Sequence, residues 1–261
     1  MGQPVQRIQP IQRMKACLNG QRGHDDHPAV PVTPAELAAA AAGAVAAGAE
    51  AVHVHPRDAS GRESLLAADV GAAVTAVRQA CPGVPVGVTT GLWAAGGDPA
   101  ARQAAVAGWV ALPAGGRPDF ASVNLGEAGA AGLPAALAEA GIAAEAGVWS
   151  AADADLLAAA GPGAGWLWLM VEISGVAAAG AVPAADAVLR RLDELGVTLP
   201  RLLHGAGESC WPLIDHAGRL GLPARIGLED TLAGPGGGPV SGNAELVELG
   251  LAAWAAAAAA P

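Results

Sequence analysis

The chain has 261 residues, of which 52% are hydrophobic, a share that is high because alanine is abundant. Its 14 Lys and Arg face 24 Asp and Glu, and this excess of acid argues against non-specific nucleic-acid binding. No apolar run reaches the roughly 18 residues of a membrane span, and residues 1–13 lack the apolar core of a secretory signal. We therefore expect a cytoplasmic protein that binds neither nucleic acid nor membrane.

The cysteines point to the same compartment. Cys17, Cys81 and Cys210 are widely spaced, odd in number and form no Cys-x-x-Cys pair. Reduced thiols in a cytosol are the expected state for such a set.

Apolar runs typical of strands alternate with helical stretches along the chain. The expected strands are 15–18, 51–55, 84–89, 120–124, 142–148, 166–171, 202–204 and 225–228. The expected helices are 34–47, 67–79, 98–111, 133–140, 151–160, 183–195, 211–220 and 243–259. The first helix has the clearest start, because Thr33, Pro34 and Glu36 form a capping box with proline at the first helical position.

Eight strand–helix units predict one (β/α)8 TIM barrel, a single domain over residues 1–261. Alternation of this kind implies a parallel sheet, and a closed barrel typically takes about 250 residues. The alternative is a doubly wound open sheet, which would usually show a glycine-rich phosphate turn after an early strand. The stretch Asn19-Gly20-Gln21-Arg22-Gly23 matches that turn poorly.

The stretch His53-Val54-His55-Pro56 ends the second expected strand. Side chains alternate across a strand, so both imidazoles point the same way, about 7 Å apart. Pro56 cannot continue a central strand, so the pair lies at the strand's carboxyl end. Such a pair suits a single metal ion better than a packed core, with two core or surface histidines as the alternative.

Polar residues also follow the other expected strands. They are Gln21, Arg22, Thr89, Thr90, Ser122, Asn124, Glu145, Glu172, His204, Glu229 and Asp230. The active site of a TIM barrel forms where its strands end and the following loops begin. So many polar side chains on one face exceed what a purely structural barrel needs, and they predict a functional site there.

Glu229 is the expected third metal ligand. Strands two and eight are both even-numbered, and alternate strands share side-chain layers, so Glu229 can meet His53 and His55 across the barrel mouth. Two neutral imidazoles and one carboxylate leave a divalent cation with net positive charge and open positions, as catalytic sites require. The alternative is that Glu229 only pairs with Arg225 or Arg57.

Asp230 follows the expected ligand directly, at the turn beyond the strand. A carboxylate there could take a proton from a carbon acid whose carbonyl oxygen the metal polarises. Arg225 would supply positive charge for the developing enolate or for a substrate carboxylate. The alternative role for Asp230 is to cap a helix before Thr231.

Several motifs stand in order along nearly the whole chain. They are Asn19-Gly20, Pro31-x-Thr33-Pro34, His53-x-His55-x-Arg57-Asp58, Thr89-Thr90-Gly91, Ser122-x-Asn124, Arg225-x-Gly227-x-Glu229-Asp230 and Asn243-Ala244-x-Leu246-Val247. Taken together they resemble the β-keto acid cleavage enzymes. The His-x-His-x-Arg and Arg-x-Gly-x-Glu-Asp motifs are far more specific together than either is alone.

The resemblance implies a zinc-containing TIM barrel, with Zn²⁺ or another divalent metal. It implies condensation of a β-keto acid with acetyl-CoA, which yields acetoacetate and a new CoA ester. The implied roles are metal binding by His53, His55 and Glu229, general base catalysis by Asp230 with Arg225 as its partner, and binding of the keto acid's carboxylate by Thr89 and Ser122, with Asn124 nearby.

Two positions depart from the family pattern. The enzymes that act on an aminated β-keto acid carry an acidic residue where this chain has Arg22, which would repel an ammonium and could pair with an anionic or hydrogen-bonding tail. Glu172 stands where we expect a glycine or another small residue, and it could neutralise Arg22. We therefore expect a side-chain pocket unlike that of the enzymes for aminated substrates.

Two other functions are compatible with parts of the pattern. A metal-dependent hydrolase on the same barrel would usually carry its histidine pair after the first strand and further histidines later, and only His204 stands at such a place. A barrel that has lost catalysis would not need His53, His55, Arg225, Glu229 and Asp230 together. We also expect a homo-oligomer, a dimer or a tetramer, because such barrels often associate.

Overall fold

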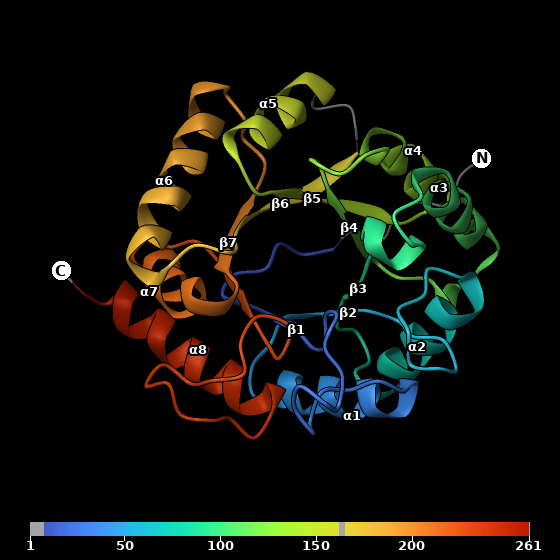
Figure 1. The fold of residues 1–261 in the computed structure, drawn as a ribbon, viewed down its shortest axis with the longest axis horizontal. Helices are drawn as coiled ribbons and strands as arrows, with labels where there is room; N and C mark the ends of the chain where they lie inside the picture. Colours follow the sequence, from blue (N-terminus) through green and yellow to red (C-terminus); the bar gives the residue numbers. More distant parts are fainter. Residues whose placement is uncertain (1–7, 162–164, 261) are drawn as a thin grey trace.

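Eight parallel strands form the centre of the computed structural model, which describes residues 8–161 and 165–260 (Figure 1). The strands are β1 (Met14–Cys17), β2 (Ala51–Val54), β3 (Val86–Thr89), β4 (Phe120–Asn124), β5 (Ala143–Val148), β6 (Trp166–Ile173), β7 (Arg201–Gly205) and β8 (Ala224–Ile226). Their order is β7-β6-β5-β4-β3-β2-β1-β8. The amide of Leu203 donates to the carbonyl of Pro223 at 3.0 Å, which brings β7 against the start of β8. The predicted single-domain TIM barrel is confirmed.

A ring of helices surrounds the strands (Figure 1). The helices are α1 (Pro34–Ala46), α2 (Ala67–Ala80), α3 (Pro99–Ala107), α4 (Leu133–Glu139), α5 (Ala151–Ala160), α6 (Ala178–Glu194), α7 (Cys210–Leu220) and α8 (Asn243–Ala258). Helix α1 begins as predicted: the Thr33 hydroxyl accepts from the amide of Glu36 at 3.3 Å, and the Glu36 carboxylate accepts from the amide of Thr33 at 2.9 Å. This reciprocal pair satisfies amides that the first turn of a helix leaves free.

Two predicted helix boundaries were wrong. Helix α6 begins at Ala178, five residues before the predicted start, and it contains Pro183. Pro183 lies in the second turn, where its missing N–H costs one backbone bond, and a proline is also common at the first position of a helix. Helix α3 ends at Ala107, and a short 3₁₀ turn, η2 (Gly108–Ala111), continues it.

The barrel interior holds a buried ion pair among large apolar side chains. Lys15 donates to Glu145, both side chains are fully buried, and the indole of Trp168 also donates to Glu145. Phe120 and Met170 pack around them. The sequence placed Glu145 at the barrel mouth, and this was wrong because its carboxylate lies inside the barrel. A buried charge requires a partner of this kind.

Cys17, Cys81 and Cys210 are buried free thiols. Within residues 8–161 and 165–260, no helix combines the length and apolar character needed to cross a bilayer. Residues 1–7, 162–164 and 261 of the predicted domain lie outside the described residues.

Candidate active site

A pocket of about 460 Å³ lies where the carboxyl ends of the strands meet the following loops. The ten residues with a predicted catalytic, substrate-binding or metal-binding role line it: Arg22, His53, His55, Thr89, Ser122, Asn124, Glu172, Arg225, Glu229 and Asp230. Thr90, Glu145 and His204, which were also expected at this face, are not part of the lining. Gly20, Gln21, Trp93, Trp149, Met170, Ser174 and Ala206 complete its walls. The pocket therefore lies at the carboxyl ends of the strands, where the active site of a TIM barrel is expected.

The two histidines lie at the end of β2, which the neighbouring β1 loop holds in place. The side-chain amide of Asn19 accepts from the backbone N–H of His55 and donates to its carbonyl, both at 2.9 Å. These two bonds satisfy the backbone where Pro56 interrupts the ladder. The ring centroids of His53 and His55 lie 5.2 Å apart, edge to face, and both residues are buried.

Glu229 meets the histidines over the end of β1 and not across the barrel mouth, so the predicted route was wrong. Strand β1 pairs with both β2 and β8, so the two ligand-bearing segments are separated by one strand only. Donor atoms of His53, His55 and Glu229 all lie within 4.8 Å of one another.

Two glycines allow this close approach. Gly20 has φ +54°, and a Cβ there would lie 2.5 Å from Cγ of Glu229. A Cβ on Gly227 would lie 1.9 Å from the carbonyl oxygen of Cys17, on β1. Any larger residue at either position would push the turn that carries Glu229 away from β1.

The imidazole of His55 is fixed by residues that sequence reasoning missed. Its Nδ1 contacts a carboxylate oxygen of Glu63, and its Nε2 lies 3.6 Å from Glu229. The indole of Trp93 stacks on the ring, with centroids 6.2 Å apart. Metal-ligating histidines commonly have their second nitrogen bound by a carboxylate, and an acidic residue soon after His55 was the available signal for Glu63.

The electrostatics of the cluster favour a positive charge between His55 and Glu229. Burial opposes the charged form of His55, but Glu229 and Glu63 outweigh it and raise the pKa to about 9. Burial also opposes ionisation of Glu229, yet Arg225 and His55 hold its pKa well below the usual range. Burial lowers the pKa of His53 well below normal, which leaves a neutral ring with its lone pair available.

These observations fit a divalent metal ion. Nδ1 of His53 and Oε2 of Glu229 are buried and have no hydrogen-bond partner within the described chain. Buried polar atoms of this kind are rare unless a ligand or an ion satisfies them. Two imidazoles and a carboxylate match the ligand set of catalytic zinc, with room for further ligands in the pocket.

Arg225 and Asp230 form a buried pair beside the cluster. Nε and Nη2 of Arg225 donate to Oδ1 of Asp230 at 3.2 and 2.6 Å, and Nη2 also donates to Glu229 at 2.8 Å. Oδ2 of Asp230 is buried without a partner. Burial raises the pKa of Asp230, and Arg225 opposes that rise. The capping role considered for Asp230 is wrong, since its carboxylate bonds to Arg225 and no described helix begins there.

The expected pairing of Glu172 with Arg22 does not occur. Nε2 of His204, on β7, lies 3.2 Å from Glu172, and its Nδ1 lies 3.8 Å from Asp230. Burial disfavours the carboxylate of Glu172, but His204 outweighs it and lowers the pKa. Nη1 of Arg22 donates instead to the carbonyl of Leu228 at 2.7 Å. Because His204 is fully buried and outside the pocket lining, it is not free to serve as a hydrolase ligand.

Thr89 and Ser122 stand side by side on neighbouring strands. They are partners in the register of β3 and β4, and both are buried at the pocket wall. The Thr89 hydroxyl accepts from the amide of Gly91 at 2.9 Å, which leaves its own O–H free to donate. Asn124, at the end of β4, donates its side-chain amide to Glu127 at 2.7 Å.

Known proteins resemble this chain in sequence and in fold. A family model described as "beta-keto acid cleavage enzyme" matches residues 14–260. A search among curated proteins gave no match. Among solved structures, ObcA with oxaloacetate is similar with a TM-score of 0.66 at 19% identity over 85% of this chain. ObcA with a C4-CoA adduct and oxalate gives 0.67, again at 19% identity over 85% of this chain.

This chain spans 63% of the ObcA chain in both matches. A 3-dehydroquinate dehydratase from Geobacillus kaustophilus gives a TM-score of 0.59 at 12% identity, over 94% of this chain and 91% of its own. At these identities the structural likenesses show the barrel fold alone. The family match covers nearly every described residue, and with it the chain belongs to the beta-keto acid cleavage enzyme family.

Proposed function

We propose that this protein transfers the acyl group of a β-keto acid to coenzyme A, using acetyl-CoA as co-substrate and releasing acetoacetate. The observation that carries the proposal is the unpartnered Oδ2 of Asp230 in the same pocket as the cluster of His53, His55 and Glu229. A base beside a cation site is the arrangement needed to ionise a carbon acid.

His53, His55 and Glu229 would hold a divalent metal ion, for which zinc suits the nitrogen and oxygen donors. When bound, such an ion acts as a Lewis acid that polarises the keto oxygen of the substrate and makes the neighbouring methylene more acidic. Glu63 fixes the ring of His55, and Arg225 holds the Glu229 carboxylate from the side facing Asp230.

Asp230 is the proposed general base. Its Oδ2 takes a proton from the methylene between the keto group and the carboxylate of the substrate. A pKa raised by burial makes this carboxylate a stronger base than an exposed aspartate, which suits proton abstraction near neutral pH. Arg225 keeps Asp230 in place through Oδ1 and supplies positive charge for the developing enolate.

Acyl transfer then needs no other reactant. The carbanion attacks the thioester carbonyl of acetyl-CoA, and the thiolate of coenzyme A leaves. That thiolate attacks the former keto carbon, the bond between this carbon and the methylene carbon breaks, and the acetoacetate carbanion recovers the proton from Asp230. The products are acetoacetate and a new acyl-CoA.

Thr89 and Ser122 would bind the carboxylate that every β-keto acid carries, with the amide of Asn124 nearby. Their position on adjacent strands gives two hydroxyl groups at one pocket wall. Arg22 and Glu172 would line the space for the variable side chain. The structure of ObcA in complex with a C4-CoA adduct and oxalate supports the proposal, because it shows a CoA compound bound to a protein of similar fold.

A substrate screen tests the proposal. The metal-loaded protein is incubated with acetyl-CoA and a panel of β-keto acids, and acetoacetate is measured. We expect acetoacetate with at least one keto acid, and D230N should lower its rate by about 10²–10⁴-fold, the usual contribution of a general base. Turnover of the keto acid without acetyl-CoA would contradict the proposal and favour a hydrolase.

A further inference from the structure

The site pocket contains two arginines with different surroundings. Arg225 is buried, and its guanidinium is engaged by Asp230, Glu229 and the sulfur of Met170. Arg22 is only partly buried and makes a single side-chain bond, from Nη1 to the carbonyl of Leu228. Among the described residues, no carboxylate lies within ion-pair distance of Arg22, although it lines the same pocket.

The loop that carries Arg22 is built to hold this guanidinium at the pocket. The guanidinium of Arg57 donates to the carbonyls of Gly20 and Arg22, at 2.6 and 2.7 Å. Gly20 turns the chain with φ +54°, three residues after the end of β1. The Leu228 carbonyl anchors the side chain next to the metal ligand Glu229. A fixed cation loses less freedom on binding an anion than a mobile surface arginine does.

Anion-binding groups therefore lie on both sides of the metal cluster. In the sheet order, Thr89 and Ser122 belong to β3 and β4, His53 belongs to β2, and His55 follows the end of β2 directly. Arg22 follows β1 and is bonded to the turn after β8. A ligand that places one carboxylate at the hydroxyl pair and its keto oxygen at the cluster would extend its other end toward Arg22.

Besides Glu229 and Asp230, which have roles at the metal cluster, Glu172 is a third carboxylate of the pocket that could oppose a second anion. One of its oxygens is held by His204, and Arg225 also lowers the pKa of Glu172. Glu172 is therefore bonded to His204 and not to Arg22. The charge of Arg22 remains without a carboxylate to balance it within the described chain.

We propose that the variable side chain of the substrate ends in a carboxylate that Arg22 binds. The substrate is then a dicarboxylic β-keto acid, with an acidic group on each side of the keto carbon. This inference rests on the proposed function for the orientation of the ligand. Arg22 discriminates between substrates and takes no part in the bond-making steps.

Equilibrium binding without acetyl-CoA tests the inference independently of turnover. Calorimetric titration compares 3-oxoadipate with 3-oxohexanoate, which has the same number of carbons and a neutral tail, on the metal-loaded protein. We expect 3-oxoadipate to bind at least about tenfold more tightly, as a charge-assisted hydrogen bond allows. R22Q should abolish this preference, while R22K should keep part of it because the charge remains.

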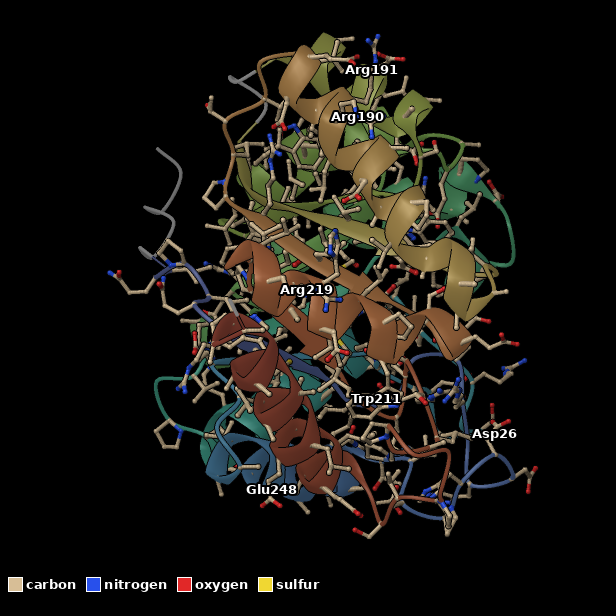
Figure 2. The ribbon with its side chains drawn as sticks, turned by 90° about the vertical axis from the view of Figure 1, so that its left-hand side faces the viewer. Asp26, Arg190, Arg191, Trp211, Arg219 and Glu248 are labelled. Atoms are coloured by element: carbon tan, nitrogen blue, oxygen red, sulfur yellow. The ribbon has the colours of Figure 1, made fainter. Side chains whose placement is uncertain are left out.

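Two controls separate discrimination from damage to the site. R190Q removes an exposed arginine on α6, on the outer face of the molecule (Figure 2), and should leave both affinities unchanged. R22Q should lower the affinity for 3-oxoadipate by a much larger factor than the affinity for 3-oxohexanoate. Equal losses for both ligands, or a wild-type preference for a neutral or aminated tail, would overturn the inference. Absence of acetoacetate formation with every keto acid would overturn only the proposed function.

Discussion

The carboxylate of Glu63 shows how a side chain outside the predicted set supports the cluster. It contacts Nδ1 of His55, so it fixes the ring with Nε2 toward Glu229. Loss of a carboxylate that orients a ligating histidine typically costs 10–100-fold in metal affinity. We expect E63Q to weaken metal binding by about this factor, measured by competition with a chelator.

A matched control for E63Q is E248Q. Glu248 is exposed on α8, at the surface of the molecule (Figure 2), and has no contact with the pocket. Its removal should leave the metal affinity as it is in the wild type. Unchanged affinity in E63Q as well would mean that the position of the His55 ring does not depend on Glu63.

The sequence correctly predicted most of the side chains that gather in the pocket. Histidines separated by one residue at a strand end, and polar residues after the other strands, were sufficient for this because strand ends meet at one face of a barrel. Glu63 was missed because it lies on a loop, and Trp93 because it lies on the short 3₁₀ helix η1 (Leu92–Ala95). No periodic pattern determines the path of either segment. Glu145 was misplaced because its position within β5 directs the carboxylate into the barrel interior.

Close contact between β1 and β8 determines the position of the turn that carries Glu229. Gly227 makes this contact possible, since a Cβ there would lie 1.9 Å from the backbone carbonyl of Cys17. Backbone cannot move aside as a flexible side chain can. We expect G227A to destabilise the protein by about 1–3 kcal/mol or more, the usual cost of overpacking, and to lower its metal affinity.

Urea denaturation and metal titration measure both effects of G227A. The control is G108A, because no heavy atom lies within 4 Å of a Cβ at Gly108 and its φ is −64°. G108A should leave the free energy of unfolding unchanged or raise it by up to about 1 kcal/mol, the usual gain when alanine replaces a glycine of compatible φ. A G227A variant with the stability and the metal affinity of the wild type would show that β1 and β8 can move apart without loss of either property.

Element types were predicted from the sequence more reliably than element ends. The eight strands and eight helices follow from the alternation of apolar runs with helical stretches. The start of α1 was predictable because Thr33 and Glu36 carry the cap in their side chains. The start of α6 was not, because proline marks a first turn in most helices and here lies in the second.

The whole molecule brings distant parts of the sequence together at one site. Closure of the barrel makes β8 the neighbour of β1, so Glu229 reaches His53 and His55 although about 175 residues separate them along the chain. The sequence correctly predicted that Glu229 meets the histidines, but not the side from which it approaches them. The prediction was based on the side-chain layers that alternate strands share inside a barrel, and these layers do not show which loops project furthest over the barrel. The order of strands in the closed sheet supplied the correct route.

The proposed chemistry depends on one divalent ion held by His53, His55 and Glu229. Elemental analysis of the purified, metal-loaded and dialysed protein tests it most directly, with H53A, H55A and E229Q measured alongside as folded proteins. We expect about one equivalent of metal per wild-type chain and nearly none in any of the three variants. Full metal content in a folded variant, or a wild type that forms acetoacetate without metal, would contradict it.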